Sequence, residues 1–371
     1  MRPLAVDVAA YSLYADPRMM RQADIEKALA ILPSAAGLDR GFLRERLGRD
    51  KNFVWLARKL PPEAEENIKK LKIKGIGFIK ESRRRYPGQS LAAHILGFAG
   101  MDDNGLEGLE LKCNNILAGR EGVAQMLRDA RQQDLLIEQN LVEPQDGHDL
   151  VLTIDENIQY FSEKALDKGF EHHRPISASL IVMNPKTGEI LALANRPAYD
   201  LNEFGRSNES SRKNRIVSDM YEPGSVFKIV TASAALEKGV FKETDKIFCE
   251  NGEYRVANHI LHDHQRHGTL MFREVIEQSS NIGVTKIAQK LGAQYVYEYA
   301  QKFGFAKKTE IDLPGEISGS LKPPRFWSAT SIGAVPIGHE VGVTTVQLAC
   351  AISVIANDGI LMKPFVVKEI R

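Results

Sequence analysis

The clearest chemical signal in the sequence is a serine and a lysine three positions apart, Ser225 and Lys228. On a helix that spacing is about one turn, so the hydroxyl and the amine would share a face and could touch. A serine becomes a nucleophile when a base takes its proton, and burial can lower the pKa of a lysine enough for it to be that base. A helix beginning at Ser225 would also stabilise developing negative charge. The pair therefore indicates nucleophilic catalysis.

Taken alone, the Ser-x-x-Lys motif has alternative explanations. About one match is expected by chance in a chain of this length, and a second match stands at Ser210 and Lys213. That pair lies in a polar run where the amine would be solvated and protonated, so we do not expect it to be catalytic. For Ser225 and Lys228 the alternative is a helix cap followed by a surface lysine.

A second motif lies downstream, where Ser279 and Asn281 form the only Ser-x-Asn triplet of the sequence. In a short turn the first and third side chains point the same way, so this hydroxyl and amide could relay a proton and hold a substrate amide. A capped turn between two helices would explain the triplet equally well on its own. The two motifs together are much more specific than either.

The elements expected around these residues form a helix-rich domain built on a sheet. The most apolar helix candidate runs from Ser225 to Lys238, and we expect it to be central and buried because it is apolar on nearly every side. Strand-like runs at 178–183 and 190–194 flank a Pro/Gly turn and predict a β-hairpin. Later helical patterns cover residues 271–291, 293–303 and 344–357.

The N-terminal part of the chain is expected to be a separate α+β domain over residues 1–147. Charged segments alternate there with glycine-containing turns. A helix beginning at Asp24 should stop at Pro33, which has no backbone N–H to donate. The turn cluster Pro144–Gly147 precedes a strand-like apolar run, so we expect the domain boundary there and a second domain over residues 148–371.

Composition bounds the possible functions. The 371 residues are 43% hydrophobic and 26% charged, which allows two or three domains with ordinary cores and excludes intrinsic disorder. A formal net charge of +1 offers no general attraction to nucleic acid or anionic lipid. Cys113, Cys249 and Cys350 lack CxxC spacing, which argues against structural zinc and allows at most one disulfide. No apolar run approaches the roughly 18 residues of a membrane span, so we expect the chain as given to be soluble.

The order Ser-x-x-Lys then Ser-x-Asn resembles that of the penicillin-recognising serine transpeptidases and β-lactamases. Further segments narrow the resemblance, over almost the whole chain, to the class B penicillin-binding proteins of the division and sporulation type. These segments are Arg85–Gly97, Gly105–Glu110, Leu117–Gly122, Asn184–Ala192 and Ile337–Ala349. The resemblance implies an α+β fold, with a non-catalytic, pedestal or dimerisation-like module followed by a transpeptidase domain of helices around an antiparallel sheet.

The resemblance also implies a role for each motif residue. The protein would be a peptidoglycan D,D-transpeptidase in which Ser225 attacks the D-Ala-D-Ala carbonyl and Lys228 is the base for acylation. Ser279 would pass the proton to the leaving group, and Asn281 would bind the substrate amide. The backbone N–H of Ser225 would contribute half of the oxyanion hole.

The resemblance further implies partners and a location. The partners would be peptidoglycan stem peptides, β-lactam antibiotics and, through residues 1–147, other cell-wall synthesis or divisome proteins. No cofactor and no nucleic acid are expected. The parent protein would be anchored in the bacterial cytoplasmic membrane, with its catalytic domain on the extracytoplasmic side and a role in cell division.

The sequence departs from the family pattern at both ends. No Lys-[Ser/Thr]-Gly motif follows Ser-x-Asn before Arg371, and the one Lys-Thr-Gly, Lys186–Gly188, precedes Ser225 in the expected hairpin turn. The family's membrane anchor and the arginine-containing segment after it are not found either. We therefore expect a fragment that is a poor catalyst by itself, because the third motif supplies the second oxyanion donor.

Three other interpretations stay open. Four histidines within nine residues, at positions 259, 262, 264 and 267, could suggest a metal site, although the resemblance implies a loop without a metal role. A β-lactamase or D,D-carboxypeptidase would share both motifs, although the class A deacylation pattern Glu-x-x-Leu-Asn does not occur. The chain could also be a non-catalytic scaffold of a cell-wall complex.

Overall fold

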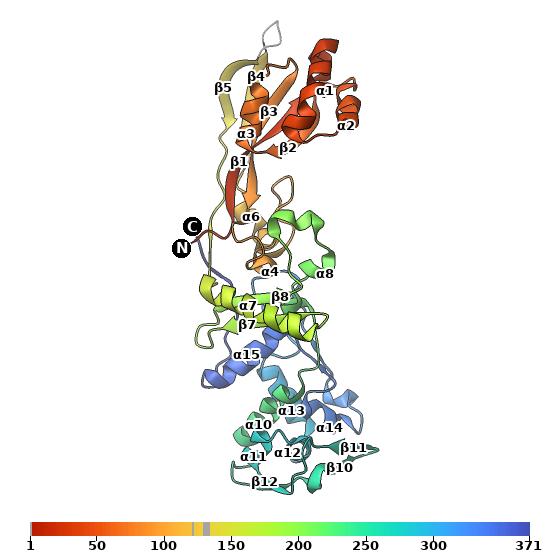
Figure 1. The fold of residues 1–371 in the computed structure, drawn as a ribbon. Helices are drawn as coiled ribbons and strands as arrows, with labels where there is room; N and C mark the ends of the chain where they lie inside the picture. Colours follow the sequence, from red (N-terminus) through yellow and green to blue (C-terminus); the bar gives the residue numbers. More distant parts are fainter. Residues whose placement is uncertain (1, 121, 129–133) are drawn as a thin grey trace. The chain divides into compact units, whose positions relative to one another are not determined.

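The computed structural model describes residues 2–120, 122–128 and 134–371 and divides the chain into two compact units (Figure 1). The first unit comprises Met1–His148 together with Asp200–Arg206, and the second comprises Asp149–Tyr199 and Ser207–Arg371. The detour of the chain back into the first unit was not foreseen from the sequence. It is fixed by Asn202, whose side chain accepts a hydrogen bond from the Tyr86 N–H (3.0 Å) and donates one to the Tyr86 carbonyl (2.9 Å).

A three-stranded antiparallel sheet forms the centre of the first unit. Strand β1 (Val6–Ala15) lies between β2 (Val54–Leu60) and β3 (Ile76–Arg85). Helices α1 (Gln22–Ala36), α2 (Arg40–Leu47) and α3 (Pro62–Lys69) pack with this sheet (Figure 1). Their shared core is apolar throughout, with Leu13, Leu32 and Leu43 fully buried in it.

The expected end of the first helix at Pro33 is wrong, because α1 continues to Ala36 and contains that proline. Pro33 lies in the last turn of α1, and its missing N–H removes a single hydrogen bond there. The last carbonyl groups of a helix have no partner within the helix in any case, so the hydrogen bonding of this end is already incomplete. The helix ends instead at Gly37, whose φ of 65° is the left-handed conformation that glycine adopts at low cost.

The rest of the first unit consists of short elements. Helices α4 (Ala93–Leu96), α5 (Gly108–Lys112) and α6 (Asn114–Leu117) precede the antiparallel pair β4 (Val123–Arg128) and β5 (Asp134–Val142). Glu110 joins this region to the sheet, since it accepts hydrogen bonds from Arg84 (2.7 Å) and from the Tyr86 hydroxyl (3.2 Å). Burial raises the pKa of Tyr86, so this phenol stays neutral.

The second unit is layered around a β-hairpin. Strands β7 (Ala178–Met183) and β8 (Ile190–Arg196) pair antiparallel, which confirms the predicted hairpin. Helix α7 (Glu156–His173) packs on β8, and α15 (Thr345–Ala356) packs on β7 (Figure 1). The terminal strand β15 (Val367–Ile370) pairs with β6 (Leu150–Leu152).

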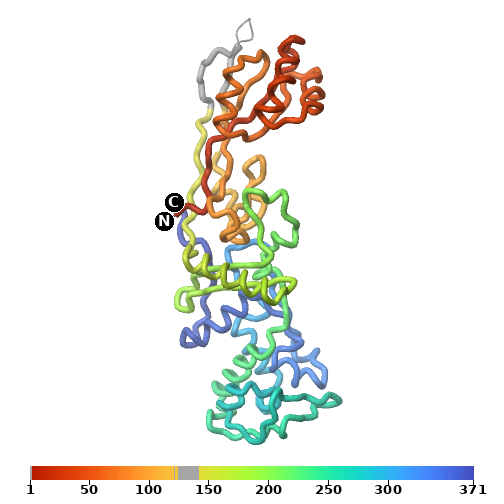
Figure 2. The backbone as a smooth tube through the Cα atoms, in the orientation of Figure 1, coloured from red at the N-terminus to blue at the C-terminus, as the bar shows by residue number. Residues whose placement is uncertain are grey.

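Helix α10 (Lys228–Glu237) occupies the middle of the helical part of this unit, as its apolar sequence predicts. One side of α10 packs into a core shared with α13 (Ala293–Lys302) and α15, and the other side packs into a core shared with α11 (Phe272–Glu277) and α12 (Asn281–Leu291). In Figure 2, α10 to α13 lie in the green to light-blue part of the chain and α15 lies in its blue part.

The helical pattern over 271–291 is divided between α11 and α12, and the Ser-x-Asn motif occupies the break. The patterns over 293–303 and 344–357 correspond to α13 and α15. The fold is thus α+β with helices around antiparallel strands, as predicted.

The second unit also contains α8 (Glu209–Arg212), α9 (Arg215–Ser218), α14 (Ser331–Ala334), β9 (Lys246–Phe248), β10 (Glu253–Val256), β11 (His259–His262), β12 (Thr269–Met271), β13 (Ser320–Leu321) and β14 (Val341–Gly342).

The three cysteines are buried and none of them forms a disulfide, so the one disulfide that their number allowed is not present. Within the described ranges, no helix combines the length and the apolar character that crossing a lipid bilayer requires.

Candidate active site

Ser225 lies in a 3₁₀ turn, Gly224–Phe227, that leads directly into α10. The turn is held against a neighbouring segment by a hydrogen bond from the Gly224 N–H to the Gly338 carbonyl (3.2 Å). Gly338 has a φ of 84°, and a Cβ atom there would lie 2.1 Å from the Gly224 carbonyl oxygen. Only glycine permits this approach, so Gly338 determines where the serine turn lies.

Glu222 makes a second connection between the same two segments. One carboxylate oxygen pairs with Nδ1 of His339 (2.8 Å), and the other accepts the backbone N–H of Glu340 (2.9 Å). These bonds hold the pKa of Glu222 below its usual value, the largest cause being the hydrogen bond with His339. Sequence reasoning missed this pair because its partners are 117 positions apart.

Lys228 is the first residue of α10 and is 2% exposed. Its amine donates hydrogen bonds to the Ser279 carbonyl (2.5 Å), the Ser279 hydroxyl (2.9 Å) and Oδ1 of Asn281 (2.8 Å). These three acceptors match the three donors of an ammonium group. Burial nevertheless lowers the pKa of Lys228 to about 8, although the negative charge of Asp263 acts in the opposite direction.

The Ser-x-Asn motif has the local geometry of a strained turn followed by a helix cap. Ser279 has a φ of 55°, which is rare for a residue with a side chain. Ser280 is the N-cap of α12, and its Oγ accepts the Gly283 N–H at 2.9 Å. The Asn281 side chain donates to the His262 carbonyl at 3.0 Å, which leaves Oδ1 free to face Lys228.

The structure therefore brings three of the four predicted residues into direct contact: Lys228, Ser279 and Asn281. Ser225 lies one turn before Lys228 and is exposed, but among the described residues no hydrogen bond joins its hydroxyl to the Lys228 amine. A buried amine with a pKa near 8 can exchange a proton with a neighbouring hydroxyl at neutral pH. The arrangement suits a serine that is acylated with a lysine as base.

The two look-alike motifs have different surroundings. The Lys213 amine forms an ion pair with Asp219 (2.5 Å), and the Ser210 hydroxyl accepts a hydrogen bond from Arg215 (2.6 Å). Lys213 is thus engaged in an ion pair with a carboxylate, whereas the Lys228 amine is buried among uncharged acceptors. Lys186 lies between β7 and β8 and pairs with Asp358 at 3.0 Å.

The histidine-rich stretch forms β11 and the loop after it rather than a cluster of ligands. In the ranges that the structure describes, no group of three or more His, Cys, Asp or Glu side chains is arranged to hold a metal ion. The stretch has another role, because Asp263 within it contacts the turn that carries Ser279 and Asn281. Sequence reasoning missed Asp263. The one signal that could have indicated it is a single carboxylate directly after a strand.

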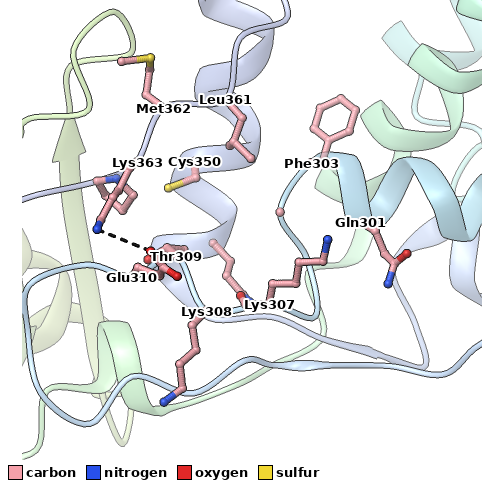
Figure 3. Close-up of a pocket in the computed structure, with 13 residues that line it drawn as sticks. Gln301, Phe303, Lys307, Lys308, Thr309, Glu310, Cys350, Leu361, Met362 and Lys363 are labelled. Carbon is pink, nitrogen blue, oxygen red and sulfur yellow. Dashed lines mark hydrogen bonds and ion pairs between the residues drawn. The ribbon is translucent and has the colours of Figure 1, made fainter.

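A cavity of about 300 Å³ lies elsewhere in the second unit, between the end of α13 and α15 (Figure 3). Lys307 and Gln301 line it, Cys350 forms part of its wall, and Lys363 pairs with Glu310 at its edge (3.6 Å). None of the four predicted site residues lines this cavity. It is therefore separate from the serine site.

Comparisons with known proteins agree with the geometry. Residues 178–371 match the family described as the penicillin binding protein transpeptidase domain, and residues 1–152 match the penicillin-binding protein dimerisation domain. A probable peptidoglycan D,D-transpeptidase PenA of Neisseria gonorrhoeae is 33% identical over 97% of this chain and 62% of its own length. Stage V sporulation protein D of Bacillus subtilis is 35% identical over 84% of this chain and 49% of its own length.

Among solved structures, penicillin binding protein 2X of Streptococcus thermophilus superposes with a TM-score of 0.77 at 27% identity. The match covers 99% of this chain and 58% of that one. The chain thus spans about three fifths of the length of the curated relatives that match nearly all of it. Both domain matches and the relatives lead to one conclusion: the chain belongs to the class B penicillin-binding proteins of the division and sporulation type.

Proposed function

We propose that this chain carries the acylation site of a peptidoglycan D,D-transpeptidase. The observation that carries the proposal is the buried amine of Lys228, one helical turn from Ser225, with a pKa of about 8 and hydrogen bonds to Ser279 and Asn281. A lysine in that state is both a usable base and the start of a proton path.

Acylation would begin when Ser225 Oγ attacks the carbonyl carbon of the penultimate D-alanine. Lys228 takes the hydroxyl proton, and the Ser225 backbone N–H donates to the developing oxyanion. The Ser279 hydroxyl, 2.9 Å from the Lys228 amine, is the route by which a proton reaches the departing amine. The carbon–nitrogen bond then breaks, D-alanine leaves, and an ester joins the stem peptide to Ser225.

Transfer would follow when the amine of a neighbouring stem peptide attacks that ester. The new amide forms as the bond to Ser225 Oγ breaks, and the proton lost by the amine returns to the serine through Lys228. β-Lactams would acylate the same serine, because their ring carbonyl mimics the acyl donor. Asn281 would orient Lys228 through Oδ1 and bind the substrate amide.

The same proposal extends to location and partners. The parent protein would work in cell division at the bacterial cytoplasmic membrane, with this chain on the extracytoplasmic side. The first unit would dock other proteins of the cell-wall machinery.

The experiment is labelling of the full-length parent protein with a fluorescent penicillin, followed by mass spectrometry of the labelled peptide. We expect the adduct on Ser225, no labelling of Ser225→Ala, and full labelling of the matched control Ser210→Ala. Rapid turnover of the penicillin instead of a stable adduct would favour a β-lactamase. If the full-length protein is not labelled, a non-catalytic scaffold explains the family resemblance better.

A further inference from the structure

We propose that Asp263 is a positioning residue of the serine site: its carboxylate holds the Ser279–Asn281 turn where it contacts the Lys228 amine. The inference rests on the proposed function for its catalytic consequence. Its geometric part rests on hydrogen bonds that are independent of any activity.

Both oxygens of Asp263 are used by this one turn. Oδ2 accepts the Ser280 hydroxyl at 2.6 Å, and Oδ1 accepts the backbone N–H of Ile282 at 3.0 Å. Ser280 Oγ in turn accepts the N–H of Gly283. The carboxylate therefore satisfies one of the unpaired N–H groups at the start of α12 directly and fixes the cap that satisfies another.

The turn needs such support because its central residue is strained. Ser279, with its φ of 55°, directs both its carbonyl and its hydroxyl to the same amine. A left-handed residue with a side chain persists only where its surroundings fix it. On the N-terminal side, backbone bonds from Ser279 to Ile276 and from Ser280 to Val275 do so. On the C-terminal side, Asp263 is the anchor.

Asp263 is itself held by a hairpin. Strand β11 pairs with β10, and the N–H of Asp263 donates to the Gly252 carbonyl at 3.2 Å. The backbone carbonyl of the preceding residue, His262, accepts a hydrogen bond from the side-chain amide of Asn281. The end of the histidine-rich strand therefore holds the Ser-x-Asn motif through hydrogen bonds to two consecutive residues, His262 and Asp263.

The charge of Asp263 gives a second consequence. The side chains that contact the Lys228 amine, those of Ser279 and Asn281, carry no charge. The negative charge that acts on this amine comes from Asp263. Burial raises the pKa of the Cys249 thiol, on which Asp263 also acts, so this thiol stays neutral. The Lys286 amine is paired with Glu250 at 2.5 Å. Removing the Asp263 charge should therefore lower the pKa of Lys228.

The test compares Asp263→Asn and Asp263→Ala with the control Glu253→Gln, which removes an exposed negative charge from the same hairpin. Asparagine can still accept the Ile282 N–H, whereas alanine cannot. Three quantities are measured on the whole chain: hydrogen exchange of the peptide containing Ser279–Gly283, the pKa of Lys228 from pH-dependent amine acetylation, and the rate of penicillin acylation.

We expect faster exchange and a loss of acylation on the order of 10²-fold in Asp263→Ala, with partial rescue in Asp263→Asn. The pKa of Lys228 should fall in Asp263→Asn and stay unchanged in Glu253→Gln. Faster exchange with an unchanged pKa and an unchanged acylation rate would overturn the proposal, because it would reduce Asp263 to a helix cap. If Asp263→Ala does not fold, the Asp263→Asn comparison decides. If the unmodified chain is not acylated, the proposed function fails, but hydrogen exchange and the pKa of Lys228 still test whether Asp263 positions the turn. A failure of the proposed function is therefore distinguishable from a failure of this inference.

Discussion

The amine of Lys228 lies 2.8 Å from Oδ1 of Asn281, a residue 53 positions further along the chain. This bond joins the first turn of α10 to the first residue of α12. Together with the two bonds to Ser279, it occupies every donor of the protonated amine. Lys228 can therefore accept a proton from Ser225 only after it has lost one of its own, which makes its pKa the controlling quantity of the site.

Replacing Lys228 with arginine should abolish most of the acylation. The variant keeps the positive charge, but a guanidinium group does not deprotonate in proteins and cannot be a base. We expect the rate of labelling by fluorescent penicillin to fall by about 10²-fold or more. Lys213→Arg is the matched control and should label normally, because Lys213 is already held in an ion pair with Asp219. Near-normal labelling of Lys228→Arg would assign the base to another residue.

The acylation rate should depend on pH through Lys228. The base is the neutral amine, whose fraction rises as pH increases through the lowered pKa of about 8. The rate should therefore increase from pH 6 and level off above about pH 9. Rates measured by stopped-flow labelling across this range test the expectation, with the unfolding midpoint as a check that the protein stays folded. A rate that is flat between pH 7 and 9 would contradict it.

The parts of the site that could be predicted from sequence are local. Helix spacing fixes the relation between Ser225 and Lys228, and the apolar pattern after them correctly indicates a central helix with a buried lysine at its start. The Ser-x-Asn motif was also found, because a polar triplet that interrupts a helical pattern is visible in the residues themselves. Two charged partners of the same site were not found. Asp263 and Glu222 act across loops, and nothing in their neighbours along the chain distinguishes them from solvated carboxylates.

The two misses in the fold have different physical origins. Pro33 is compatible with a helix here because it falls in the last turn, a position that depends on where Gly37 ends the helix. The return of residues 200–206 to the first unit depends on Asn202 pairing with the Tyr86 backbone across 116 positions. Local propensity carries no information about this tertiary contact, whereas the glycine that ends α1 is a local signal.

The ion pair of Asp167 with Arg196 should make the second unit sensitive to acid. Hydrogen bonds from Arg196, the largest cause, lower the pKa of Asp167, so its stabilising effect is present above the unfolded pKa and is lost as pH falls through the lower folded pKa. Because the Asp167 side chain is 48% exposed, solvent screening limits the expected loss in Asp167→Asn to about 1 kcal/mol at pH 7.

Urea unfolding at pH 7 and at pH 3 measures this loss. The difference between Asp167→Asn and the unmodified chain should shrink at the lower pH, where the carboxylate becomes protonated. Asp358→Asn, which breaks the exposed pair with Lys186, should change stability little at either pH. A difference for Asp167→Asn that is the same at both pH values would show that lost packing, and not charge, is responsible.

Replacing Gly338 with alanine should displace the serine turn. The new Cβ would lie 2.1 Å from the Gly224 carbonyl oxygen, so the segment that carries Ser225 must move. Gly359→Ala is the matched control, since Gly359 has a similar φ of 87° but nothing within 4 Å of its added Cβ. Both variants carry the cost of a left-handed backbone, roughly 1–2 kcal/mol, so any excess in Gly338→Ala measures the close approach. We expect that excess in urea unfolding, and a loss of penicillin acylation in Gly338→Ala alone. Equal stability and equal acylation of the two variants would mean that the Gly224–Gly338 contact does not position the nucleophile.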